Sequence, residues 1–248
     1  MTMKYYRVFI AGLLMVMIMV QTPPAVAKFS DILKGAKKAI GVSEELPESK
    51  IIEGLKEALE IGIGNAVGLI SNLDGYYKNP KIKIPLPGAV KKVEKALRAV
   101  GYGSKVDAFE QSMNRAAEQA APEAKTLFID TIKQMSFADA RKILNGRDNE
   151  ATLYFKAKTW DRLSEKFEPL VHSTMSTVGV TRFYQELDKK VRSIPFADSI
   201  TNFNLDQYVT EGALDGLFFM LEKEEQKIRK EPLARVTDLL KKVFGSKR

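Results

Sequence analysis

The sequence has no cysteine and only one histidine, His172, among its 248 residues. Without cysteine the chain forms no disulfide and offers no thiolate to a metal, and one histidine rarely suffices for a zinc or iron site. Any Ser-His-Asp triad would have to use His172. On its predicted helix, however, His172 points away from the apolar side, so we expect it on the solvated surface. We therefore expect no metal, no cofactor and no catalytic residue.

Long hydrophobic runs are also scarce. The apolar run from Val8 to Val20 is shorter than the roughly 20 residues that span a bilayer. Lys4 and Arg7 precede this run and Ala25-Val26-Ala27 follows it, which is the pattern of a secretory signal peptide with a small-residue cleavage site. We predict that residues 1–27 are removed after Ala27 and that the protein is exported. An uncleaved N-terminal anchor is the alternative.

No sign of charge dominates strongly. The chain has 39 Lys and Arg against 31 Asp and Glu, a net charge of +8, and these charges are mostly interleaved as on a solvated surface. We find no basic stripe with interleaved aromatic residues, so we expect no nucleic-acid partner.

One basic segment follows the predicted cleavage site. Residues 28–42 repeat apolar side chains at helical spacing beside Lys34, Lys37 and Lys38, which predicts a short basic amphipathic helix. Such a helix binds an anionic membrane surface only weakly. Docking of this helix on its own domain is the alternative. The polar stretch that follows, with Pro47, reads as a linker.

Helical periodicity dominates the rest of the chain. From Ser49 to Ile70 apolar residues recur every three or four positions, and Leu205 to Lys230 forms the longest predicted helix. Separate helices are predicted through Phe155 and from Thr159 to Val178, and another from about 181 to 191. Only residues 81–88, KIKIPLPG, alternate like an extended segment. We predict an all-α fold, a single compact domain of about nine helices over residues 48–245, preceded by the signal peptide (1–27) and the basic helix with its linker (28–47).

Two glycine-rich or oxygen-rich patterns have simple structural explanations. Gly62-Ile63-Gly64 with Gly68 resembles a dinucleotide loop only superficially, because no strand precedes it, and we expect close helix packing there. The stretches at 72–75 and 145–150 lack the spaced acids of a calcium-binding loop, so we expect turns and helix caps.

A set of polar residues on two helices is the best candidate for a site. On the helix from Ser104 to Ala121, Asn114, Arg115 and Glu118 lie with Asp107 and Gln111 opposite the predicted core face. On the longest helix, Asp215 has apolar neighbours, where a carboxylate is costly without a partner. We predict that Asp215 pairs with Arg115 or another buried cation, and that Asn114, Arg115 and Glu118 border a partner-binding surface. A pair that only orders helix packing is the alternative.

Several segments, in a fixed order, resemble one bacterial family. They are KIPLPGAVKKVEKALRAVG, SMNRAAEQAAPEAK, IKQMSFADARKIL, ATLYFKAKT, YVTEGALDGLFFMLEKEEQKIRKEP and TDLLKKVFG. Together, from about residue 46 to 245, they resemble the family named domain of unknown function 4197. The resemblance implies an exported, mainly helical protein of Gram-negative-type bacteria, and hence a periplasmic location. It carries over no catalytic residue, because no activity is established for the family.

Three functions remain open. We favour a non-enzymatic binding or scaffolding module of the cell envelope, since no nucleophile, base and oxyanion donor assemble in the sequence. The first alternative is a carrier of an apolar ligand such as a lipid, with a pocket lined by Phe218, Phe219 and Met220. The second is a hydrolase that uses paired carboxylates.

Overall fold

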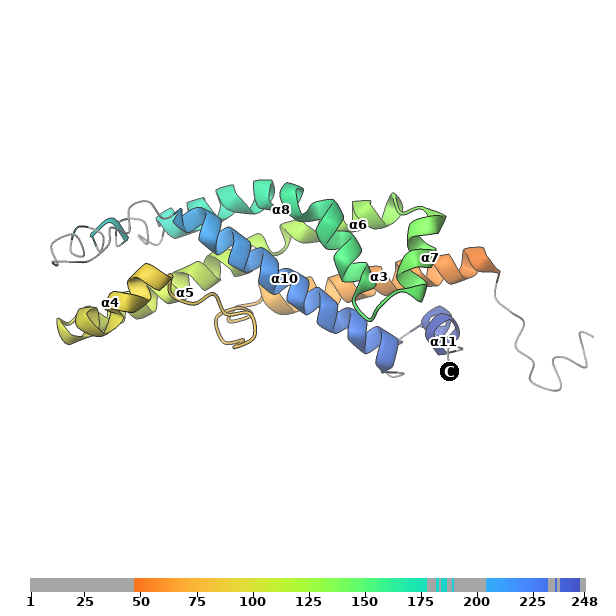
Figure 1. The fold of residues 1–248 in the computed structure, drawn as a ribbon, viewed down its shortest axis with the longest axis horizontal. Helices are drawn as coiled ribbons and strands as arrows, with labels where there is room; N and C mark the ends of the chain where they lie inside the picture. Colours follow the sequence, from red (N-terminus) through yellow and green to blue (C-terminus); the bar gives the residue numbers. More distant parts are fainter. Residues whose placement is uncertain are drawn as a thin grey trace, which may run out of the picture. The chain divides into compact units, whose positions relative to one another are not determined.

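A computed structural model describes residues 47–177, 204–231 and 237–245, together with residues 182, 184–186, 189 and 235. These residues form eight α-helices and no strand, which confirms the predicted all-α class (Figure 1). The helices are α3 (Glu48–Ser71), α4 (Gly88–Ala99), α5 (Gly103–Ala120), α6 (Glu123–Lys133), α7 (Phe137–Asn145), α8 (Glu150–Thr177), α10 (Leu205–Lys230) and α11 (Asp238–Gly245). The predicted signal peptide, the basic helix at 28–42 and the 181–191 helix fall largely or wholly outside the described residues.

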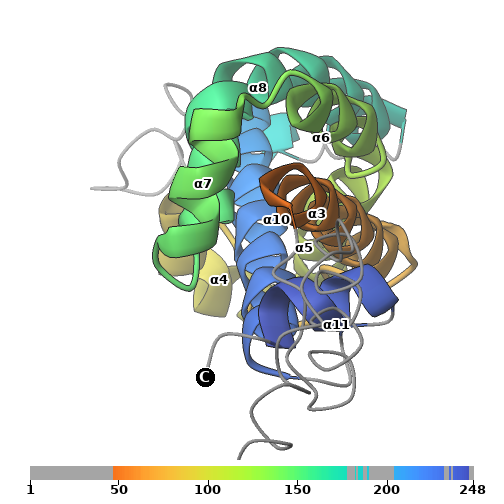
Figure 2. The ribbon, with the colours of Figure 1, turned by 90° about the vertical axis from the view of Figure 1, so that its right-hand side faces the viewer.

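Helices α3 and α10 form the centre of the bundle. Helix α10 packs on α8, α3 and α5, and α3 also packs on α6, α7 and α11, as the end-on view of Figure 2 shows. The predicted apolar stripe of α3 is buried along its whole length, from Ile52 to Ile70. Burial of this stripe drives α3 into the core, because each fully buried aliphatic side chain contributes roughly 1.5–3 kcal/mol.

Local signals set several helix ends. Ser136 and Asp139 form a complete capping box at the start of α7. After α4 the chain turns at Gly101, whose φ of 88° lies in the left-handed region that glycine adopts without strain. The amide of Tyr102 donates to the carbonyl of Leu97 at 2.9 Å across this turn. Short-range chemistry therefore fixes these boundaries.

Helix α8 differs from its prediction, because the two separate helices are one. Thr159 does not break the helix, since its hydroxyl donates to the carbonyl of Phe155 at 2.7 Å and its side chain is buried. The exposed Pro169 also lies inside α8 without ending it.

No helix in the described part of the chain is long and apolar enough to cross a membrane.

Residues 72–87, which we call the crossing segment, connect α3 to α4 without helical structure. Ile82, Ile84 and Leu86 are buried, whereas Lys81 and Pro85 are exposed, which confirms the predicted alternation. The crossing segment lies over α5 and α10, where the polar side chains described next hold it in place.

Candidate functional site

Asn114 of α5 holds the crossing segment through both atoms of its amide group. Its Oδ1 accepts a hydrogen bond from the Ile84 amide at 2.8 Å, and its Nδ2 donates to the Ile84 carbonyl at 2.9 Å. The same nitrogen also donates to the Glu110 carbonyl at 2.8 Å. Asn114 is fully buried, so it satisfies both backbone groups of one residue in the absence of water.

Glu118, one turn further along α5, anchors the other end of the crossing segment. Its Oε1 accepts from the amides of Tyr76 at 3.0 Å and Tyr77 at 3.2 Å, and its Oε2 accepts from Arg115 at 2.6 Å. Arg115 also pairs with Asp74, which has a left-handed φ of 69°. The carboxylate is 3% exposed, and its negative charge is balanced within the cluster.

The cluster corrects the prediction for this face of α5. Asp107 and Gln111 are exposed as expected, but Asn114 and Glu118 are buried and Arg115 is largely covered. The prediction assumed that water covers the side of α5 opposite the core face, whereas the crossing segment covers part of it. Hydrogen bonds from Lys78 and Arg115 lower the pKa of Asp74.

Two glycines let the crossing segment approach α10 closely. A Cβ atom at Gly216 would lie 2.5 Å from Cε1 of Tyr76, and one at Gly212 would lie 3.2 Å from Ile84. Tyr76 is fully buried, and its hydroxyl donates to the Ala213 carbonyl at 2.6 Å. Burial, together with the charge of Glu118, raises the pKa of the Tyr76 phenol, so the phenol remains a donor.

Asp215 is not buried, and its predicted pairing with Arg115 is wrong. Its side chain is 66% exposed and accepts from Lys156 of α8 at 3.1 Å. The ammonium group of Lys156 also lies 4.5 Å from the centre of the Trp160 ring. The apolar residues around Asp215 in the sequence face other directions on α10, so this helix position reaches the surface.

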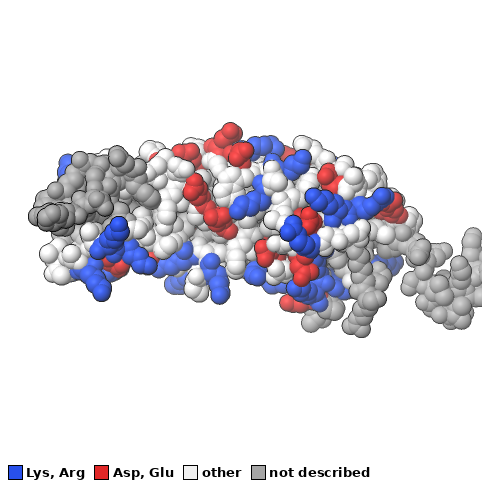
Figure 3. All heavy atoms as spheres, in the orientation of Figure 1, with Lys and Arg blue, Asp and Glu red and all other residues white. Residues whose placement is uncertain are grey.

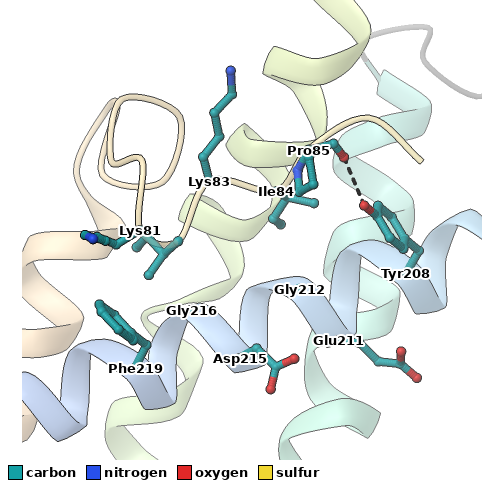
Figure 4. Close-up of a pocket in the computed structure, with 11 residues that line it drawn as sticks. Lys81, Lys83, Ile84, Pro85, Tyr208, Glu211, Gly212, Asp215, Gly216 and Phe219 are labelled. Carbon is teal, nitrogen blue, oxygen red and sulfur yellow. Dashed lines mark hydrogen bonds between the residues drawn. The ribbon is translucent and has the colours of Figure 1, made fainter. Parts of the chain in front are cut away.

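Asp215 lies instead on the edge of a groove of about 420 Å³, which we call the α10 groove (Figure 4). One wall is the crossing segment from Lys81 to Pro85, and the other is α10. Figure 4 shows Phe219 pointing towards Lys81 at one end and Tyr208 pointing towards Pro85 at the other. The Tyr208 hydroxyl donates to the Pro85 carbonyl at 3.1 Å.

Asn114, Arg115 and Glu118 therefore do not line the groove but hold the segment that forms its wall. Sequence analysis missed Lys81, Lys83, Tyr208 and Glu211 as lining residues. The four-residue spacing of Gly212 and Gly216, read together with the extended segment, is the signal that could have indicated close approach of two backbones.

A second buried glutamate, also missed, stabilises the far end of the bundle. Glu225 of α10 accepts from the amides of Ala151 and Thr152 at 3.0 and 2.9 Å, at the start of α8. Arg229 donates two hydrogen bonds to the same carboxylate and one to the Ile143 carbonyl at 2.8 Å. Free amides at a helix start need such an acceptor, so this pair is architectural.

The remaining candidates have structural roles. His172 is 60% exposed, as predicted, and its Nδ1 lies 2.7 Å from a carboxylate oxygen of Asp206. A Cβ atom added at Gly62 would make only an ordinary contact, 3.4 Å from Ile228 of α10, and nothing lies within 4 Å of one added at Gly64 or Gly68, so the close packing expected at these glycines is not seen.

The residues expected to line an apolar pocket divide between the core and the surface. Phe218 is buried, with its ring against Phe128 and Trp160. Of Phe218, Phe219 and Met220, only Phe219 lines the groove. Among the described residues no group of His, Asp and Glu is placed to hold a metal ion.

Comparison with known proteins finds one family. The family model described as "Protein of unknown function (DUF4197)" matches residues 45–245, which includes every helix described above. No curated protein and no solved structure matches the chain.

Proposed function

Because the chain belongs to the DUF4197 family, whose description states no activity, we propose a function from the α10 groove: an exported, non-enzymatic binding module of the cell envelope that receives an extended segment of a partner protein. The observation that carries this proposal is the buried polar anchoring of the groove wall. The side chains of Asn114, Glu118 and Tyr208 hydrogen-bond the backbone of the crossing segment. Tyr76 of the segment itself donates to the Ala213 carbonyl of α10. A binding surface benefits from such support, because a preorganised wall loses little entropy when a ligand binds.

The dimensions of the groove suit a short extended peptide. From Tyr208 to Phe219 the helix rises about 16 Å at 1.5 Å per residue. An extended chain covers that distance in roughly five residues. Lys81 borders one side and Glu211 the other, so a partner segment with both an acidic and a basic side chain complements the groove.

The arrangement of charged groups favours binding over hydrolysis. Glu211 and Asp215 lie one turn apart on the same wall, whereas a glycosidase-like pair faces its substrate from two sides. Lys83 pairs with Glu110 at 2.7 Å, and Asp215 pairs with Lys156. The charged rim also speaks for a peptide rather than the apolar ligand of a carrier.

Site-specific photo-crosslinking in the native host tests this function. A photo-reactive phenylalanine analogue at Phe219 should give a discrete adduct with one protein. The analogue at Phe137 of α7, which is 63% exposed and remote in sequence, is the matched control and should not give this adduct. The Asp215→Lys variant should reduce the adduct at Phe219, because it reverses one charge of the groove.

Three outcomes would overturn the proposal. An adduct that forms equally at Phe219 and Phe137 indicates unspecific contact, and no adduct at Phe219 indicates that nothing binds there. An adduct with the mass of a lipid supports the carrier instead.

Export is tested separately. N-terminal sequencing should show that the mature protein begins at Lys28, and a protein that begins at Met1 contradicts export with cleavage after Ala27.

A further inference from the structure

Basic residues are concentrated in one part of the chain. Residues 78–105 contain eight Lys and Arg and a single acid, Glu94, although the whole chain has 39 basic and 31 acidic residues. Nearly all of the excess positive charge therefore belongs to the crossing segment, α4 and the start of α5. Figure 3 shows basic side chains along the lower left of the molecule, where α4 lies in Figure 1.

Three lysines of α4 form one exposed face. Lys91, Lys92 and Lys95 lie on the side opposite the buried Val90 and Leu97, and in the described part of the chain no acid pairs with them. Lys91 and Lys95 are one turn apart, where like charges repel and destabilise a helix. Such an arrangement gains free energy when an anionic surface supplies the missing counter-charges.

Other basic residues nearby are already neutralised. Arg98 donates to Asp107 at 2.6 Å and to Glu94 at 2.9 Å, and Lys83 pairs with Glu110. The fold thus pairs the charges that face α5 and leaves the outer lysines of α4 exposed.

Apolar side chains accompany these lysines at the end of α4. Val100 is 69% exposed beside the turn at Gly101, and Ala96 and Ala99 are exposed on the helix. Within the described residues α4 packs chiefly on α5, which leaves its outer side exposed there. Lysines beside exposed apolar residues are typical of surfaces that contact lipid headgroups and the adjacent acyl region, whereas nucleic acid gains nothing from Val100.

We propose that Lys91, Lys92 and Lys95, the basic face of α4, together with the exposed Val100 that follows the helix, dock the protein on an anionic phospholipid surface. The three ammonium groups contact headgroup phosphates, and Val100 inserts at the level of the headgroups. This surface is separate from the α10 groove and is used whether or not the groove binds a peptide.

Vesicle flotation with the chain from Lys28 to Arg248 tests the docking. The protein should bind vesicles with about one third phosphatidylglycerol, but not vesicles of phosphatidylcholine alone, and roughly 0.5 M salt should release it. The triple variant Lys91→Gln, Lys92→Gln, Lys95→Gln should bind on the order of 10- to 100-fold more weakly. Val100→Asp should also weaken binding.

Matched controls separate this face from net charge. Lys125→Gln, Lys158→Gln, Lys166→Gln removes three exposed lysines of α6 and α8 and should bind like the wild type. Phe137→Asp removes an exposed apolar residue elsewhere and should be neutral. Circular dichroism melting of every variant verifies folding.

Equal losses in the two triple variants, or no loss in either, would overturn the proposal. Binding to a soluble polyanion such as heparin but not to anionic vesicles, with the same dependence on Lys91, Lys92 and Lys95, would also overturn it and assign the face to a polyanion.

Discussion

At the scale of single residues, two buried glutamates carry out the same task at two places in the bundle. Glu118 and Glu225 each accept hydrogen bonds from two consecutive backbone amides. Each is neutralised by an arginine of its own helix, Arg115 three residues earlier and Arg229 four residues later. The paired arginine supplies a counter-charge at a buried position where an isolated charge would be costly.

Glu225→Gln should destabilise the protein strongly. The substitution preserves side-chain size but leaves the largely buried Arg229 without its counter-charge, and losing one partner of a buried pair costs about 3–5 kcal/mol. The free energy of unfolding in urea should fall accordingly. Glu211→Gln, at an exposed position on the same helix, should change it by less than about 0.5 kcal/mol. Equal effects of the two substitutions would show that the Glu225 cluster is not structural.

Asp74 should contribute to the loss of stability in acid. Hydrogen bonds from Lys78 and Arg115 lower its pKa in the folded state. The contribution is therefore present above the unfolded pKa of about 3.9 and is lost as pH falls through the folded value. Urea midpoints at pH 7 and at lower pH should differ less for Asp74→Asn than for the wild type. Asp161→Asn, at an exposed position on α8, should keep the wild-type difference.

At the scale of elements, the helices follow from short-range patterns and the crossing segment does not. The stripe from Ile52 to Ile70, the capping box at Ser136 and the turn at Gly101 were predictable, because each depends on neighbours within a few residues. Nothing local indicates that Ile84 hydrogen-bonds Asn114, since the partners lie 30 residues apart. Helical periodicity alone therefore predicted that Asn114 is exposed to solvent.

Gly216→Ala should disrupt the contact between α10 and the crossing segment. The new methyl group would lie 2.5 Å from the buried Tyr76 ring, so the ring or the segment must move. We expect a loss of stability of roughly 1–3 kcal/mol, as for overpacked cores. Gly64→Ala is the control, because nothing lies within 4 Å of the new Cβ and a helix-interior alanine is favoured by about 0.5–1 kcal/mol. Thermal unfolding should show the opposite signs, and a stabilised Gly216→Ala would disprove the close contact.

At the scale of the whole molecule, the candidate site depends on surfaces that meet only after folding. Asp215 was assigned to the interior because its sequence neighbours are apolar, yet α10 presents it beside the groove, on a strip that includes Gly212. The groove itself exists because α5 and α10 both contact the crossing segment. The sequence pattern predicted α5 and α10 as helices. The position of the crossing segment between them depends on the packing of the folded chain.

The helical domain should be independent of the residues before Pro47, because it forms a compact unit of its own. The Pro47 carbonyl accepts from the Lys50 amide at 2.8 Å, so a chain that begins at Pro47 retains the first turn of α3. Its free energy of unfolding should equal that of the chain from Lys28 within about 0.5 kcal/mol. A chain that begins at Glu57 loses the buried Ile52 and Leu55 and should be destabilised by several kcal/mol, at about 2–5 kcal/mol per large residue removed.

The central position of α10 has a consequence for the timing of folding. Asn65 of α3 and Glu224 of α10 are 159 residues apart in the sequence but are hydrogen-bonded in the fold. The core therefore cannot close until the ribosome has made nearly the whole chain, because contacts between distant segments form late. A chain with a secretory leader, as we propose here, must pass an export channel before it folds. On this proposed route, the late arrival of α10 keeps the earlier helices open for threading until the chain has crossed the membrane.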